Sequence, residues 1–379
     1  MPRILPNNAR AMLRMVLRIG HRRYTNEERD LFLLLETHIK DIRDKNKSQW
    51  NRIALTSKAV KAYSGTDLEL DAILEFGARL DVNSFNLVTP LHDRIGLYLD
   101  PGAAFINHSC DYNSVVGFDG DELFVKAIRT IQKDEQIFIS YIDSTNPCDI
   151  RQAELRERYF FDCRCPKCEP GEDPADLLPD PSTIETAERN PIDITVTENS
   201  DPSKTVSQVE SAMQTLRQTY SWPLTRQPLI TLRDELITAL LSTGKFNSAF
   251  IQAAIRHTRV DPIVYPLDAH PLRNIHAWTL AKQAIHLSQE MDPDPVGTIS
   301  LYKYDMNFSL IIWSILNDLV NRESQSCTVP SFKKIVRSAY DEVNQEFLVN
   351  GLDPNHMREE IKKEWEKMDR LVSLALDKN

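Results

Sequence analysis

Long apolar runs are missing from this sequence of 379 residues. Its most apolar stretch, residues 310–316, is far shorter than the roughly 20 residues that cross a bilayer, and the amino terminus lacks a signal-peptide core. Positive charge is also in deficit, because 45 Lys and Arg stand against 55 Asp and Glu, a formal net charge of −10. We therefore expect no membrane association and no direct nucleic-acid binding.

Cysteine is scarce, with six residues, and none precedes Cys110. This number and its uneven spacing do not suit a secreted disulfide framework, so we predict a reducing compartment. Three cysteines fall within residues 163–168, where thiolates can converge on one tetrahedral zinc ion. A structural zinc needs a fourth protein ligand. Cys110 is the best candidate, because Cys148 follows a proline in a predicted loop and Cys327 lies in the helical half.

Acidic residues are absent before Glu27, whereas arginines recur through the same segment. An Arg-rich, acid-poor, amphipathic start can indicate a mitochondrial presequence, which is a minor alternative here. We favour an ordinary helix with a solvated basic face. Its apolar positions, Ala9, Met12, Leu13, Val16 and Leu17, follow the spacing of one packed helix face.

Two further helix starts are predicted in the first eighty residues. Thr25 and Glu28 have the spacing of a capping box, in which each side chain bonds the other's backbone N–H. Thr66 and Glu69 repeat this spacing before Leu70 and predict a second capping box.

Strand patterns follow the helices. Apolar residues alternate at 95–99, at 123–127 and at 137–141, with turn residues between the runs, which predicts three short strands. Residues 149–159 return to a helical pattern that leads into the cysteine cluster. The predicted class is therefore α+β in this part of the chain.

Cations are nearly absent from residues 169–210, which hold many acids and six prolines but only Arg189 and Lys204. This composition has little to bury and predicts a linker or surface excursion. From residue 207 onward amphipathic helices dominate, with loosely recurring helix pairs around glycine turns such as Gly244. A tetratricopeptide-like stack is suggested, although no strict 34-residue signature occurs.

A second constellation surrounds the segment Asn107-His108-Ser109-Cys110. Taken alone, it could be a polar turn with a satisfied histidine. It is followed, however, by a strand pair, by Tyr141 in Ile-Ser-Tyr-Ile-Asp, by a helix, and by Tyr-Phe-Phe-Asp before the cysteine cluster. This order resembles the carboxyl-terminal half of the SET domain, in particular the SET and MYND (SMYD) family of lysine methyltransferases. A zinc scaffold unrelated to SET would instead place Tyr141 and His108 far apart.

The resemblance implies an incomplete SET-domain β-fold with inserted helices and a zinc-bound post-SET segment, followed by an α-helical, tetratricopeptide-like domain. Residues 80–85 look like the strand that enters the site in that family. The predicted domains are a helical segment at 1–82, the SET core at 83–147, the post-SET zinc segment at 148–169, the acidic Pro-rich linker at 170–206 and the helical carboxyl-terminal domain at 207–379.

The resemblance also implies the site residues. Tyr141 is then the catalytic tyrosine. The cofactor S-adenosylmethionine is contacted by Asn83, Asn107, His108, Tyr141 and Phe161. The lysine channel is walled by Phe85, Tyr141 and Tyr159. The family's structural zinc site corresponds to Cys110, Cys163, Cys165 and Cys168.

Two family features have no counterpart in this sequence. None of the 11 glycines forms the Gly-x-Gly segment whose backbone approaches the cofactor, and the Cys/His-rich MYND finger is absent. We expect a sheet without the first SET strands. The leading hypothesis is a protein-lysine N-methyltransferase of the nucleus or cytoplasm acting on histone or non-histone proteins. The alternative is a catalytically inactive SET-derived module with structural zinc, which binds protein partners through its helical carboxyl-terminal domain.

Overall fold

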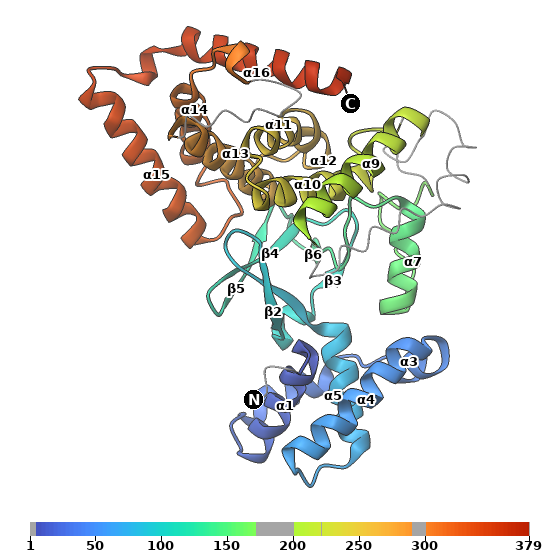
Figure 1. The fold of residues 1–379 in the computed structure, drawn as a ribbon. Coiled ribbons are helices and arrows are strands. Elements are labelled where there is room, and N and C mark those ends of the chain that lie inside the picture. The colour runs from blue at the N-terminus through green and yellow to red at the C-terminus, as the bar shows by residue number, and fades with distance from the viewer. Residues whose placement is uncertain (1–4, 172–200, 221, 290–300, 379) are drawn as a thin grey trace. The chain divides into compact units, whose positions relative to one another are not determined.

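The computed structural model describes residues 5–171, 201–220, 222–289 and 301–378 (Figure 1). Contacts divide the chain into two compact units. The first unit comprises Met1–Ser144 and Cys148–Glu172, and the helical unit comprises Thr145–Pro147 and Asp173–Asn379. Most of the predicted acidic linker, residues 172–200, lies outside the described residues.

Five helices open the first unit: α1 (Asn7–Gly20), α2 (Asn26–Leu34), α3 (Ile39–Lys45), α4 (Lys47–Ser64) and α5 (Leu70–Asn83). The predicted apolar face of α1 is confirmed, because Met12, Leu13 and Val16 are buried against α4 and α5. The capping box of α2 is confirmed as well: Thr25 Oγ1 accepts the Glu28 N–H at 3.1 Å, and Glu28 Oε2 accepts the Thr25 N–H at 2.7 Å.

Two expectations for α5 were wrong. Glu69 is its N-cap residue without a side-chain hydrogen bond, and Thr66 Oγ1 instead accepts the N–H of Leu68 at 3.2 Å, so no second capping box forms. Residues 80–83 are helical, and the strand begins only at Phe85. Leu80 is buried on the same helix face as Ile73, so helical packing takes the apolar residues that resembled a strand.

Three small sheets follow in the first unit. Strands β1 (Phe85–Val88) and β2 (Arg94–Tyr98) are antiparallel, as are β4 (Ser114–Asp119) and β5 (Glu122–Ala127). After the short helix α6 (Pro101–Ala104), strand β3 (Asn107–His108) pairs in parallel with β6 (Phe138–Ile139). The three predicted strand regions are confirmed, although the third spans only two residues. The α+β class is confirmed too.

Helix α7 (Cys148–Tyr159) confirms the helix predicted at 149–159. Its Leu155 is fully buried in a cluster that also holds Ile142, Tyr159 and the neighbouring cysteines. The chain segment after α7 packs on this second apolar cluster, which thereby positions residues 159–168.

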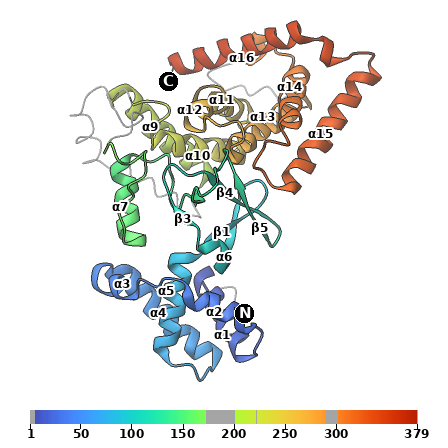
Figure 2. The ribbon, with the colours of Figure 1, turned by 180° about the vertical axis from the view of Figure 1, so that it is seen from behind.

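Within its described residues the helical unit contains α9 (Pro202–Tyr220), α10 (Leu229–Ser242), α11 (Phe246–Ile255), the π-helical turn η2 (Arg256–Val260), α12 (Asp261–Val264), α13 (Pro271–Gln289), η3 (Leu301–Tyr304), α14 (Phe308–Asn321), α15 (Pro330–Val349), η4 (Pro354–His356) and α16 (Arg358–Lys378). Helix α9 packs on α10, α10 on α11, α11 on α13, α13 on α14 and α14 on α15, whereas α16 packs against α11 and α14 (Figure 2). Gly244 joins α10 to α11 with a φ of +74°, a conformation that favours glycine. Among the described helices, none has the length and apolar content that a bilayer span requires.

Candidate active site

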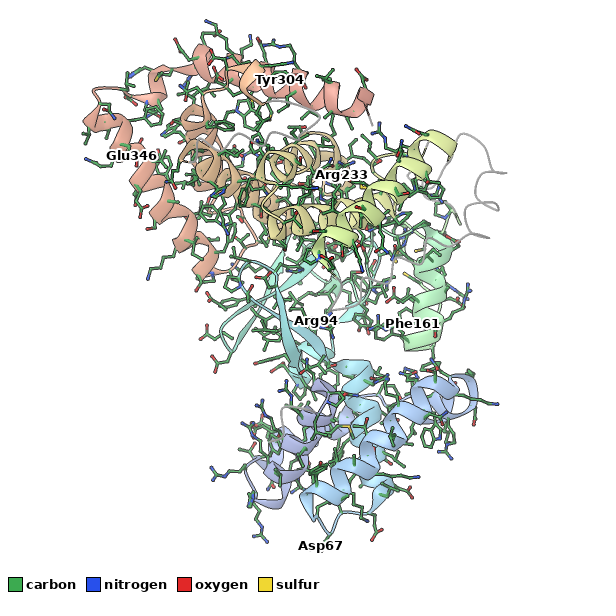
Figure 3. The ribbon with its side chains drawn as sticks, in the orientation of Figure 1. Asp67, Arg94, Phe161, Arg233, Tyr304 and Glu346 are labelled. Atoms are coloured by element: carbon green, nitrogen blue, oxygen red, sulfur yellow. The ribbon has the colours of Figure 1, made fainter. Side chains whose placement is uncertain are left out.

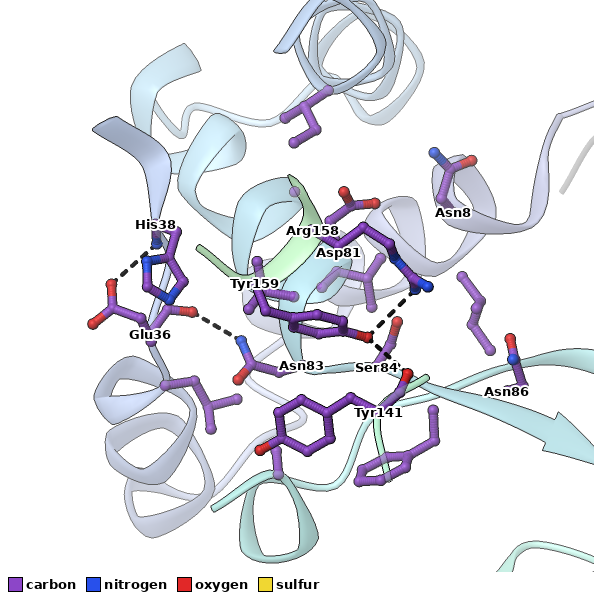
Figure 4. A pocket seen from close by; sticks show the side chains of 18 of the residues that line it. Asn8, Glu36, His38, Asp81, Asn83, Ser84, Asn86, Tyr141, Arg158 and Tyr159 are labelled. Carbon is purple, nitrogen blue, oxygen red and sulfur yellow. Dashed lines mark hydrogen bonds between the residues drawn. The ribbon is translucent and has the colours of Figure 1, made fainter. Parts of the chain in front are cut away.

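A cavity of about 760 Å³ lies within the first unit. Its walls come from the end of α5, the β1–β2 hairpin, the α6–β3 connection, the end of β6 and the end of α7 (Figure 4). Six of the residues predicted for the site line it: Asn83, Phe85, Asn107, Tyr141, Tyr159 and Phe161. The fold therefore gathers residues that are up to 78 positions apart, from Asn83 to Phe161, around one space.

His108 does not line this cavity but is buried behind it, with 8% of its surface exposed. Its Nδ1 accepts the backbone N–H of Tyr141 at 3.0 Å, so the ring proton is on Nε2, which lies 3.3 Å from Cys110 Sγ. Burial, assisted by the charge of Arg151, lowers the pKa of His108 to about 4. The imidazole is therefore neutral at pH 7. Because Tyr141 and His108 are in contact, the unrelated-scaffold interpretation is excluded.

Tyr141 presents an oriented phenol to the cavity. Its hydroxyl donates to the carbonyl of Ile106 at 2.6 Å, which leaves the oxygen lone pairs free to accept a hydrogen bond. The ring lies 5.0 Å from that of Tyr159, whose hydroxyl donates to the Tyr141 carbonyl at 3.3 Å (Figure 4). Burial, and to a smaller extent the neighbouring Tyr159, raises the pKa of Tyr141 to about 12.

The connection between α2 and α3 forms a wall that sequence analysis missed. Glu36 and His38 line the cavity there, and the Glu36 carbonyl accepts Asn83 Nδ2 at 2.8 Å (Figure 4). The buried Arg79 guanidinium donates to the carbonyls of Leu33 and Leu35 at 3.3 and 3.2 Å and holds this connection in place. Only a short polar Glu-Thr-His segment after an apolar run marked it in the sequence.

The cavity also contains an ion pair between two elements. Arg52 of α4 donates two hydrogen bonds, of 2.8 and 2.7 Å, to the carboxylate of Asp81 on α5. Gln49 Nε2 adds a third at 2.6 Å. The carboxylate of Asp81 is therefore held by three hydrogen bonds, one ion-pair partner among them. This is consistent with a structural residue of the cavity wall rather than a general base.

Four cysteines meet next to this site. The sulfurs of Cys110, Cys163, Cys165 and Cys168 all lie within 4.8 Å of one another. A tetrahedral zinc with bonds of about 2.3 Å needs its sulfurs about 3.8 Å apart, so the four thiols fit such an ion after a small contraction. Cys148 and Cys327 are buried, form no disulfide and lie outside this group.

The electrostatics of this cluster are those of a site that needs a cation. Burial raises the pKa of Cys110, Cys163 and Cys168. Burial also opposes ionisation of Cys165, but hydrogen bonds from Cys163 and nearby groups outweigh it and lower its pKa to about 7. The fully buried Arg151 places Nη2 3.7 Å from Cys168 Sγ. One arginine offsets one of the four charges that ionised thiols would carry, and a bound divalent ion would offset two more.

The sequence is similar to those of known proteins. Residues 17–142 match the sequence model of the SET domain. The chain is 42% identical over 122 residues to "SET domain and MYND-type zinc finger protein 6" of Schizosaccharomyces pombe, which covers 32% of this chain and 25% of that protein. It is 27% identical over 183 residues to mouse "Histone-lysine N-methyltransferase SMYD3", covering 47% and 42% respectively.

A third relative, "N-lysine methyltransferase SMYD2-A" of Danio rerio, is 32% identical over 164 residues, 42% of this chain and 37% of that protein. The chain thus matches between 25% and 42% of the length of these relatives. It contains a SET domain, and its homologues are SET and MYND domain lysine methyltransferases.

Proposed function

We propose that this chain is an S-adenosylmethionine-dependent protein-lysine N-methyltransferase. The observation that carries the proposal is the Tyr141 hydroxyl, oriented by the Ile106 carbonyl in a cavity that also contains Asn107 and Phe161. The match of residues 17–142 to the SET domain supports it.

S-adenosylmethionine supplies an electrophilic methyl group when it is bound. Asn83, Asn107 and Phe161 would hold this cofactor, with Glu36 and His38 extending the same wall. A neutral amine must meet the methyl group in line, so alignment governs the rate. His108 contributes from behind the cavity, because it fixes the backbone of Tyr141 rather than facing the ligand.

The aromatic side chains of the chain would prepare the lysine. A free lysine has a pKa near ~10.4 and is charged at neutral pH. Phe85, Tyr141 and Tyr159 would form an apolar channel that disfavours the ammonium by desolvation. The proton of the Tyr141 hydroxyl is directed at the Ile106 carbonyl, so the oxygen would accept an N–H of the lysine amine. This hydrogen bond would keep the lone pair of the amine nitrogen directed toward the methyl donor.

Zinc would be a structural element without a chemical step. Cys110 precedes the strand pair, whereas Cys163, Cys165 and Cys168 follow α7, so one ion would tie both sides of the cavity together. The substrates would be histone or non-histone proteins with an accessible lysine, in the nucleus or cytoplasm. The helical unit would bind protein partners.

The first experiment is calorimetric titration of the zinc-loaded chain with S-adenosylmethionine, beside a methyl-transfer assay of Tyr141→Phe. The expected result is binding by both proteins and a loss of transfer of at least about a hundred-fold in the variant. Tyr63→Phe is the matched control, because Tyr63 is an exposed tyrosine of the same unit outside the cavity.

The missing Gly-x-Gly segment favours one second candidate, the inactive SET-derived interaction module. A folded, zinc-loaded chain that does not bind the cofactor would overturn the enzyme proposal and support this module. Full methyl transfer by Tyr141→Phe would refute the proposed role of Tyr141 but not the enzyme proposal.

A further inference from the structure

The β1–β2 hairpin contains an irregularity that turns Arg94 toward the cavity. Asn86 of β1 pairs with Leu97 of β2, so their side chains share one face, and both line the cavity. Strict alternation from Leu97 would place Arg94 on the opposite face. Ile95, however, has no pairing partner on β1, and Arg94 pairs with Val88. Val88 lies on the same face of β1 as Asn86. Such a bulge re-aims the side chains beyond it.

Arg94 accordingly lines the cavity, on the side of the hairpin toward Phe161 (Figure 3). Ile95, the skipped residue, is 59% exposed. The bulge thus places an exposed cation at the cavity wall and leaves the apolar side chain of Ile95 in solvent, which burial alone would not favour. Such an arrangement points to a ligand for the cation.

The other charged groups of the cavity already have partners. Arg52 is bound to Asp81, Arg158 pairs with Glu154, and the Glu36 carboxylate accepts two backbone N–H groups at 2.9 and 3.0 Å. Among the residues that the structure describes, the guanidinium of Arg94 makes no ion pair or side-chain hydrogen bond. It is exposed and ready to bind an anion.

We propose that Arg94 binds an acidic side chain of the protein substrate and so selects which lysines are methylated. This inference rests on the proposed function. A guanidinium binds a carboxylate through two parallel hydrogen bonds, which gives geometric selectivity as well as affinity. The hairpin that carries Arg94 also carries Phe85 of the proposed lysine channel, whereas the residues proposed for the cofactor lie on other elements.

The register of the hairpin sets the spacing of this acidic residue. Arg94 is level with Val88, three residues along β1 from Phe85, or roughly 10 Å at the rise of a strand. An extended substrate with its lysine at Phe85 would bring a side chain about three positions away to Arg94. Tails with only Lys and Arg around the target would be poor substrates, because they place like charge there.

The test uses the full zinc-loaded chain and fluorescein-labelled peptides with one central lysine in a background of alanine, glycine and serine. Each peptide carries one glutamate, two to four positions from the lysine on either side, and has a glutamine twin. Affinity is measured by fluorescence anisotropy, with and without S-adenosylhomocysteine. Wild type is compared with Arg94→Gln and Arg94→Glu, and with Arg14→Gln as control, since Arg14 is an exposed arginine of α1 outside the cavity.

We expect wild type to bind one glutamate peptide about three- to ten-fold more tightly than its glutamine twin, as suits a partly exposed ion pair. Arg94→Gln should lose this preference, and Arg94→Glu should prefer the twin or a lysine at that position. Arg14→Gln should keep the wild-type preference. Equal affinities in wild type, no measurable binding of any glutamate peptide, or a preference that survives in Arg94→Gln would each overturn the inference.

The carboxylate at the amino-acid end of the cofactor is the alternative ligand for Arg94. Titration with S-adenosylmethionine distinguishes it from an acidic side chain of the substrate. Weaker cofactor binding in Arg94→Gln, with the peptide preference intact, would assign Arg94 to the cofactor and refute the substrate role. Methyl transfer by wild type is recorded separately on the same peptides. A glutamate preference without any transfer would sustain the binding of an acidic side chain by Arg94 while refuting the proposed enzyme, and with it the selection of lysines for methylation.

Discussion

The backbone N–H of Tyr141 donates a hydrogen bond to Nδ1 of His108, at 3.0 Å and across 33 residues. This single bond sets the tautomer of the imidazole, because the accepting nitrogen has no proton. The other nitrogen then points its N–H at Cys110 Sγ, 3.3 Å away. His108 therefore contacts both the candidate catalytic tyrosine and the cysteine cluster.

Replacing His108 should release the Tyr141 amide. In His108→Ala this N–H loses its acceptor, which costs about 1–3 kcal/mol locally. Hydrogen exchange of the segment around residues 138–142 should accelerate by about five-fold or more. His108→Asn should exchange at an intermediate rate, since Asn Oδ1 replaces the accepting atom. Unchanged exchange in His108→Ala, measured by mass spectrometry, would contradict this account.

Zinc content should depend on four particular cysteines. We expect about one zinc per chain by elemental analysis, because four thiols complete a tetrahedral shell. Cys163→Ser should lose most of this zinc, whereas Cys148→Ser should retain it, because Cys148 lies outside the cluster. Chelation should increase hydrogen exchange around residues 107–112 and 161–168 and leave α13 and α14 unchanged. Equal zinc loss in both variants would refute the assignment.

The Tyr141 hydroxyl should remain protonated at a pH at which an ordinary tyrosine is ionised. Its folded pKa of about 12 exceeds the reference value of 10.0, so the neutral phenol is favoured by folding. The associated stability is complete below pH 10 and is lost between pH 10 and 12. At pH 11 about one tenth of Tyr141 should be tyrosinate, measured as the absorbance difference between wild type and Tyr141→Phe. An ionised majority at that pH would contradict the burial argument.

Arg256 should be a main stabilising residue of the helical unit. Its Nε lies 3.1 Å from Asp234 Oδ1 and 3.2 Å from Oδ1 of Asp261, a carboxylate with no exposed surface. Arg256→Met leaves that buried charge to His276 alone and should cost about 3 kcal/mol.

The control for this prediction is Arg259→Met, which breaks a more exposed pair with Asp369 and should cost less than about 1 kcal/mol. Urea unfolding followed by tryptophan fluorescence reports mainly on this unit, because four of the five tryptophans belong to it. Equal losses in the two variants would show that burial of the pair has little effect.

Local patterns predicted a large part of this structure. The capping box of Thr25 and Glu28 and the apolar face of α1 are set by residues within a few positions of each other, so their spacing suffices. The order of Asn107, Tyr141 and Tyr159 likewise indicated residues that the fold gathers around one cavity. The end of α5 could not be predicted, because Leu80 and Val82 fit either a strand or a helix.

The sequence by itself determined the residue types of the site, the start of α2 and the three adjacent cysteines, since each depends on short-range spacing. Tertiary structure alone decided that Glu36 and His38 reach the cavity, because a connection between helices is positioned by Arg79 from another helix. It also decided the direction of Arg94. A one-residue shift in strand register reverses a side chain, and register depends on the partner strand rather than on the strand's own sequence.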